Sequence, residues 1–116
     1  MNPDAFDAAV AALTRVQGVR GAMVVEAETG VPVTAELAAG VDGGPLAALA
    51  ASLFQRAGRA TAAGSMGALT AVQLEAAGGH VVMAGAGPLV VVAIAESDAQ
   101  LGMIRVEAER AAAGLR

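Results

Sequence analysis

Residues 89–95 read Leu-Val-Val-Val-Ala-Ile-Ala, and this unbroken apolar run limits the possible folds more than any other segment. A Gly-Ala-Gly-Pro turn precedes the run and Glu96 follows it, so its length and composition predict a strand over residues 89–96. An antiparallel strand is apolar on both sides only where both faces of its sheet are covered. We therefore expect this strand at the centre of a sheet, with helices above and below.

Four other segments have the alternation and the turn boundaries of strands. In residues 20–28, Met23 and Val25 share one face while Val24 and Glu26 share the other. The short Thr-Gly turn that follows predicts antiparallel pairing with residues 31–37, and a proline near the start of that strand favours a sheet edge. Glycine-rich turns then join the last three strands, which we expect at residues 68–76, 80–85 and 89–96.

Helical spacing of apolar residues marks both ends of the chain. Asn2 or Asp4 can cap a first helix, and Gly18 ends it. Ser97, with Gln100 three residues later, has the pattern of a capping box before a last helix. The apolar stripes are Phe6, Val10, Leu13 and Val16 in the first helix and Leu101, Ile104, Ala108, Ala111 and Leu115 in the last.

A third helix is expected at residues 45–63, between two glycine-rich loops. The element order is therefore α-β-β-α-β-β-β-α, an α+β domain built on an antiparallel sheet. The middle helix covers one face of the sheet and the two terminal helices cover the other. We expect a single domain over residues 1–116.

The middle helix is apolar around nearly its whole circumference from Leu46 to Phe54. One subunit needs only one apolar stripe, so the excess predicts a homodimer in which two middle helices pack near a two-fold axis. Small residues at Ala47, Ala48 and Ala51 would let the second helix approach closely, although alanine is also simply a good helix former. An apolar edge strand at residues 68–76 would pair across the same dimer. The expected interface residues are Leu46, Leu49, Ala50, Leu53, Phe54, Leu69, Val72 and Leu74.

Charge and composition exclude several classes of function. All seven basic residues are arginines, they are dispersed, and the net charge is −4, which disfavours nucleic-acid binding. The absence of lysine removes Walker-type phosphate binding and Schiff-base chemistry. No cysteine is present, no signal peptide is visible, and the longest apolar run is too short to span a bilayer. We therefore expect a cytoplasmic protein that binds no membrane.

Catalytic patterns are scarce. Ser52, Ser65 and Ser97 are candidate nucleophiles and His80 is the only imidazole base, but no serine lies in a nucleophile-elbow motif. A helix, a turn and a cap account for the three serines, and His80 is expected to be exposed at the start of a strand. No histidine or carboxylate group has the spacing of a metal site. We expect neither a metal nor a cofactor, and a hydrolase using Ser65 and His80 is the least favoured hypothesis.

The sequence resembles the roadblock family, which includes dynein light chains and MglB-type regulators of Ras-like GTPases. The resemblance covers nearly the whole chain. It rests on Val-Gln-Gly-Val-Arg-Gly-Ala-Met-Val-Val at residues 16–25, Glu-Thr-Gly at 28–30, the Ala/Leu-rich middle helix, the apolar strand at 89–95, and Leu-Gly-Met-Ile-Arg at 101–105. Order and spacing together make these motifs specific.

This resemblance implies a five-stranded antiparallel sheet between helices, dimers joined through the middle helix and the third strand, and a function without catalysis. It also implies that the paired middle helices dock on a small Ras-like GTPase, for which Gln55, Arg56 and Arg59 are the partner-facing candidates. Both arginines could equally be ordinary solvated residues. The sequence stops at Arg116 without the C-terminal extension of some GTPase-activating members. An adaptor that only dimerises or senses a small ligand therefore stays open as an alternative.

Overall fold

A computed structural model of the chain describes residues 3–116 and contains the expected order of elements. The predicted α-β-β-α-β-β-β-α arrangement is confirmed. The elements are α1 (Pro3–Thr14), β1 (Val19–Glu26), β2 (Pro32–Leu37), α2 (Gly43–Ala63), β3 (Ala71–Ala76), β4 (Gly79–Ala86), β5 (Leu89–Ala95) and α3 (Leu101–Ala113).

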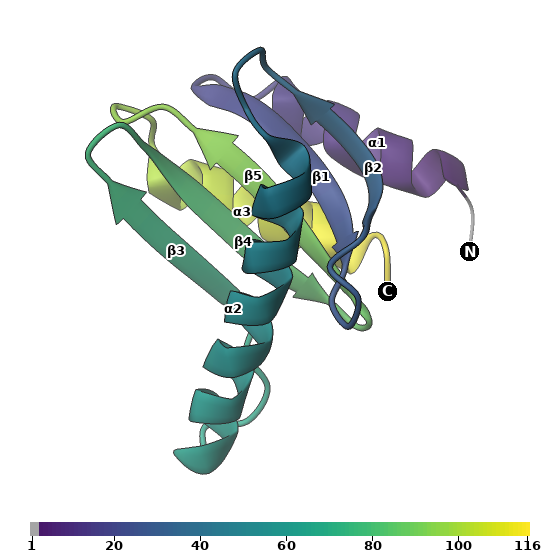
Figure 1. Cartoon of the computed structure of the whole chain (residues 1–116), viewed down its shortest axis with the longest axis vertical. Coiled ribbons are helices and arrows are strands. Elements are labelled where there is room, and N and C mark those ends of the chain that lie inside the picture. Colours follow the sequence, from purple (N-terminus) through teal and green to yellow (C-terminus); the bar gives the residue numbers. More distant parts are fainter. Residues whose placement is uncertain (1–2) are drawn as a thin grey trace.

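The five strands form one antiparallel sheet in the order β2-β1-β5-β4-β3. The strand β5 lies at its centre, as its sequence predicts, and Val90, Val91 and Val92 are fully buried although they point to alternate faces. The proline-containing strand β2 lies at one edge, and β3 lies at the other. Figure 1 shows the twisted sheet with helices on both sides.

The two faces of the sheet are covered unequally. The helices α1 and α3 pack side by side on one face, where Leu13 and Ile104 are fully buried against Val24 and Val91. The helix α2 crosses the other face alone and lies over β2, β1 and β5. Its C-terminal end projects beyond the sheet in Figure 1. The part of this face formed by β4 and β3 is therefore left less covered.

Several boundaries differ from the sequence-based expectation. The prediction that Ser97 caps the last helix is wrong, since α3 begins at Leu101 with Gln100 at the N-cap position and no side-chain cap bond. The intervening residues form a turn in which the Ala99 N–H donates to the Glu96 carbonyl at 3.1 Å. Asp4 lies inside the first turn of α1, where a carboxylate favours the helix dipole. The other proposed cap, Asn2, lies outside the described residues.

The strand β3 begins at Ala71, three residues later than predicted, because the chain first returns from the projecting end of α2. Gly67, with φ +84°, turns the chain on this return path. Leu69 then packs beside Gly58 of α2, its Cβ 4.0 Å from where a Cβ on that glycine would lie. Local apolar sequence alone does not distinguish such a return segment from the strand it leads into.

Candidate interaction surface

One side of α2 is fixed against the sheet by small residues. Ala47, Ala50 and Ala51 recur at helical spacing and are 0%, 5% and 2% exposed. One turn further on, the ring of Phe54 lies against Gly85 of β4, where an added Cβ would stand 2.9 Å from Cζ. Alanine and glycine thus bring α2 close to the sheet. The prediction that Ala47 and Ala51 admit a second helix is wrong, because both already face their own sheet.

A second stripe of α2 is only partly covered. Leu46, Leu49 and Leu53 follow one another at helical spacing, and Leu49 is 70% exposed. Ala48, on the other flank of the helix, packs on the β1–β2 turn, its Cα 3.0 Å from where a Cβ on Gly30 would lie. The leucine stripe therefore points away from β2, toward the sheet half that α2 leaves less covered.

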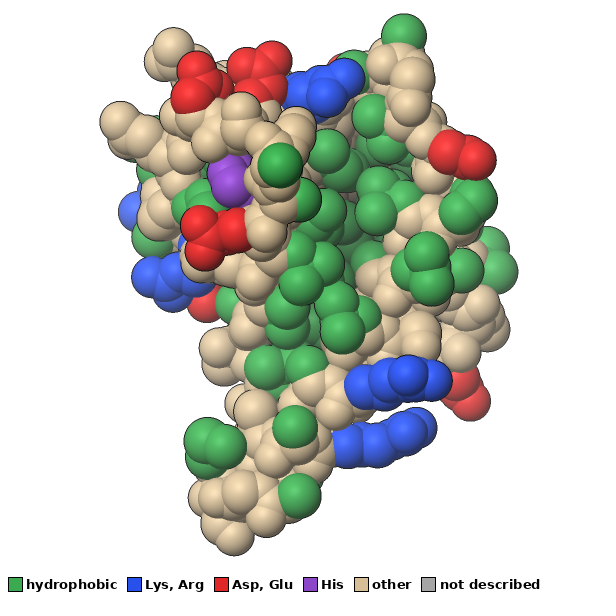
Figure 2. All heavy atoms as spheres, turned by 60° about the vertical axis from the view of Figure 1, so that its left-hand side comes forward, with side chains coloured by type: hydrophobic (Ala, Val, Ile, Leu, Met, Phe, Trp, Pro, Cys, Tyr) green, Lys and Arg blue, Asp and Glu red, His purple; other side chains and the backbone are tan. Residues whose placement is uncertain are grey.

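The sheet contributes apolar side chains to the same surface. Leu74 pairs with Val81 across β3 and β4, and Val81 pairs with Ile94 across β4 and β5, so the three residues share the α2 face. Val81 and Ile94 are half-buried and Leu74 is 40% exposed. Figure 2 shows these hydrophobic side chains gathered in a hollow between α2 and the β3 edge. We define the open apolar surface as Leu46, Leu49, Leu53, Val72, Leu74, Val81 and Ile94.

The expected interface residues lie around this hollow with different exposures. Leu49 and Leu74 are exposed, and Ala50 is buried between α2 and the sheet. The half-buried ones are Leu46, Leu53, Phe54, Leu69 and Val72. Sequence reasoning missed Val81 and Ile94, although the register of the two Gly-rich hairpins places both on the face of Val72.

The polar side of α2 is cationic. Gln55, Arg56 and Arg59 are all exposed, as the resemblance implies for partner-facing residues. No acidic residue occurs from position 43 to 74, although the whole chain carries a net charge of −4. Within residues 3–116 neither guanidinium forms an ion pair. Figure 2 shows the cationic side chains beside the lower end of the open apolar surface.

The structure does not bring Ser65 and His80 together, and His80 meets Ser97 only through the backbone carbonyl of that serine. Ser65 lies in the turn after α2, at the projecting end of that helix, and Thr70, five residues later, is where the chain reaches β4 by accepting the Gly85 N–H. His80 lies at the other end of β4, five residues or roughly 16 Å away along the strand. Its Nε2 lies 2.9 Å from the Ser97 carbonyl oxygen and its Nδ1 is buried. The expectation of an exposed His80 is wrong, since the ring is half-buried and braces the loop after β5.

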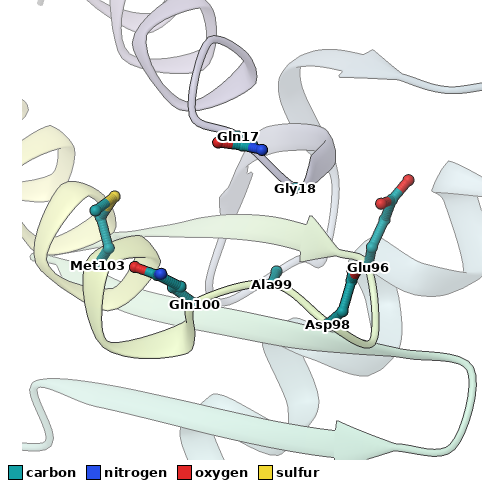
Figure 3. Close-up of a pocket in the computed structure, with 7 residues that line it drawn as sticks. All are labelled: Gln17, Gly18, Glu96, Asp98, Ala99, Gln100 and Met103. Atoms are coloured by element: carbon teal, nitrogen blue, oxygen red, sulfur yellow. The ribbon is translucent and has the colours of Figure 1, made fainter.

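A shallow cavity of about 330 Å³ lies at the opposite end of the molecule from the projecting end of α2. Figure 3 shows Glu96 and Met103 at its two ends and Gln17 and Gln100 between them. Among the described residues that line it are the carboxylates of Glu96 and Asp98, but none is a serine or a histidine. In the described part of the chain, no three His, Asp or Glu side chains are placed to hold a metal ion.

A sheet sandwiched between helices, with an open apolar surface beside a single central helix, defines an α+β domain of the roadblock type. Residues 5–95 match the model of the Roadblock/LC7 domain family. The chain belongs to this family. Among residues 3–116, no helix is both long and apolar enough to cross a membrane.

Relatives and solved structures agree with this assignment. Two uncharacterized proteins of Methanocaldococcus jannaschii are each 31% identical over 107 residues, which is 92% of this chain and 93% of the relative. The fold is similar to MglB from Myxococcus xanthus, with a TM-score of 0.87, 20% identity, and coverage of 98% of this chain and 86% of that one. A Roadblock/LC7 domain from Streptomyces avermitilis gives a TM-score of 0.82 at 21% identity, covering 95% and 93% of the two chains.

Proposed function

We propose that this chain is a homodimeric regulator or scaffold, without catalytic activity of its own, that binds and modulates a small Ras-like GTPase. The open apolar surface beside α2 is the observation that carries the proposal. An apolar hollow lined by Leu49, Leu53 and Leu74 is unfavourable in water, and such patches mark interaction sites. Membership of the Roadblock/LC7 family supports a regulatory role.

The first occupant that we propose for this surface is a second copy of the chain. Symmetric dimers bury the same patch on both subunits, and a helix stripe next to an edge strand allows such self-complementary packing. The edge strand β3 also leaves backbone N–H and C=O groups unpaired on its outer side, which a second β3 would satisfy. The interface would contain Leu46, Leu49, Ala50, Leu53, Phe54, Leu69, Val72 and Leu74, with Ala50 contributing little because it is already buried.

The proposed GTPase site is the outer side of the paired α2 helices. Gln55, Arg56 and Arg59 are exposed there, in a segment free of acidic residues. The two guanidiniums of each subunit, which form no ion pair among the described residues, can bind carboxylates of a partner and guide its approach. The resemblance to MglB-type regulators and the shared fold with MglB support this choice of partner. We propose that the domain, residues 1–116, works in the cytoplasm, since a chain without cysteine suits a reducing compartment.

The dimer is tested by sedimentation equilibrium of the wild type and of Leu49→Asp. We expect the wild type to be dimeric at micromolar concentration, and the variant to be monomeric because a charge would be buried at the two-fold axis. Met103→Asp is the matched control, since Met103 is also an exposed apolar helix residue, 54% exposed on α3. A wild type that stays monomeric at millimolar concentration would contradict the dimer.

The GTPase is tested by binding titrations with the small Ras-like GTPases of the source organism, loaded with GDP or with a non-hydrolysable GTP analogue. We expect binding to one nucleotide state, weakened at least about tenfold by Arg56→Glu with Arg59→Glu. Arg15→Glu with Arg20→Glu is the control, because it makes the same charge change at exposed positions away from α2. Equal binding by wild type and the α2 variant would exclude this face. Dimers that bind no GTPase in either state would instead support the adaptor alternative.

A further inference from the structure

A second open cavity, of about 430 Å³, lies on the face of the sheet opposite α2. It is located where the β1–β2 and β4–β5 turns lie side by side, at the lower right of the sheet in Figure 1. A hydrogen bond of 2.9 Å from the Ala27 N–H to the Pro88 carbonyl joins the two turns. Neither α1 nor α3 closes it. The residues that line it are Phe6, Glu26, Glu28, Val33, Pro88 and Leu89.

A β-bulge gives this cavity its apolar wall. Val24 pairs with Thr34 and Val25 pairs with Pro32, so Val33 is an extra residue with no partner on β1. Val33 is 42% exposed and lines the cavity together with Phe6 of α1, while Leu89 forms a buried floor. Val31, in the same hairpin, is 57% exposed. The bulge therefore places apolar side chains in water beside a cavity, where a partner's apolar atoms would cover them.

Two carboxylates give the cavity its charge. Glu26 and Glu28 both line it and both are exposed. The hydroxyl of Thr29 donates to Glu26 Oε1 at 2.7 Å, which orients this carboxylate and leaves its second oxygen free to accept. None of the described residues that line the cavity is basic. An occupant must therefore combine an apolar stem with a cationic head.

We propose that this cavity binds an arginine side chain with apolar neighbours, presented by a segment of a partner protein. Arginine fits because its methylene stem packs on apolar surface while its planar guanidinium binds carboxylates through paired hydrogen bonds. The stem would lie on Phe6 and Val33, and the guanidinium would meet Glu26 and Glu28. Because the site lies across the sheet from α2, it remains open in the proposed dimer and binds independently of a GTPase.

The test uses two peptides, acetyl-Leu-Arg-Leu-amide and the same peptide with citrulline, which keeps the shape of arginine but has no charge. Each is titrated into the ¹⁵N-labelled full chain and followed by NMR. We expect the arginine peptide to shift the amides of Glu26, Glu28, Val33 and Leu89, and to bind roughly tenfold more tightly than the citrulline peptide. Shifts elsewhere, or equal binding of both peptides, would overturn the proposal.

Glu26→Gln with Glu28→Gln provides the second arm. Glutamine keeps an acceptor for Thr29 and the volume of each side chain, so we expect an unchanged fold and about fivefold to tenfold weaker binding of the arginine peptide. Glu96→Gln with Asp98→Asn removes the same two charges at the other end of the sheet and serves as the control. If both double variants weaken binding equally, only the net charge attracts the peptide and the site is disproved. Neither result depends on whether a GTPase binds α2.

Discussion

Gly18 and Gly40 have nearly the same backbone conformation in very different surroundings. Their φ angles are +90° and +89°, in the left-handed region that side chains with a Cβ rarely adopt. A Cβ on Gly18 would stand 2.8 Å from the Cβ of Ala99, in the loop before α3. A Cβ on Gly40 would have no heavy atom within 4 Å. The pair separates the cost of backbone strain from the cost of a steric clash.

Gly18→Ala should therefore be much more destabilising than Gly40→Ala. We expect Gly40→Ala to lower the free energy of unfolding by about 1 kcal/mol through strain alone. Gly18→Ala adds overpacking at a site whose carbonyl also accepts the Glu96 N–H at 2.8 Å, for a total of about 3 kcal/mol. Urea unfolding followed by circular dichroism measures both. Equal losses in the two variants would show that the contact with Ala99 relaxes freely.

Among the elements, β5 and α2 differ most in how their neighbours hold them. Both edges of β5 are paired and both of its faces are covered, by α3 on one side and α2 on the other. The helix α2 rests on the sheet through Ala47, Ala50 and Ala51, and its last turns project beyond the sheet. Protection against local opening follows burial and pairing of this kind.

Hydrogen exchange should show this difference directly. We expect the β5 amides to exchange most slowly, at the rate of global unfolding, and the amides of residues 58–63 to exchange through local fraying. In Leu49→Asp, which removes the proposed dimer contact, the α2 amides should exchange faster. The β5 amides should still exchange more slowly than those of the other strands. Exchange along α2 that is as slow in this variant as in the wild type would mean that the subunit alone holds the helix.

The sequence predicts elements whose apolar pattern extends over many residues, and it misses those set by single contacts. The apolar run at 89–95 correctly placed β5 at the centre, and Pro32 correctly placed β2 at an edge. The start of α3 is predicted wrongly because Ser97 lies in a turn before the helix. The carbonyl oxygen of Ser97 lies 2.9 Å from Nε2 of His80, which is 17 residues earlier in the chain. The bulge at Val33 has no local signature either, since it depends on the register with β1.

The interaction surface was likewise predictable only where an apolar pattern extends over many residues. The excess apolar surface of α2 was visible in the sequence because Leu46, Leu49 and Leu53 add a second stripe to a helix that needs only one. The sequence does not show which alanines face the sheet. Ala47, Ala48 and Ala51 are the same residue type, and only the tertiary fold places Ala47 and Ala51 on the sheet and Ala48 on the β1–β2 turn. The sequence also does not predict the cavity that Glu26 and Glu28 line, because α1, the β1–β2 hairpin and the β4–β5 turn together supply its walls.

On the scale of the whole molecule, shared burial links stability to association. If α2 and β3 are completed only by a second subunit, folding and dimerisation are coupled, and the melting temperature must rise with protein concentration. A hundredfold increase in concentration stabilises such a dimer by about 2.7 kcal/mol. For two chains of 116 residues, this corresponds to an increase of about 5 °C in the melting temperature.

Calorimetry of the wild type at about 5 µM and at about 500 µM measures this increase in the melting temperature. Leu49→Asp should melt at one temperature over the whole range, because its folded form is a monomer, whereas Met103→Asp should keep the wild-type dependence. The comparison distinguishes two kinds of dimer. A concentration dependence in the wild type that Leu49→Asp retains would place the dimer contact away from α2. Loss of the dependence in that variant alone would make the leucine stripe a determinant of folding as well as of assembly.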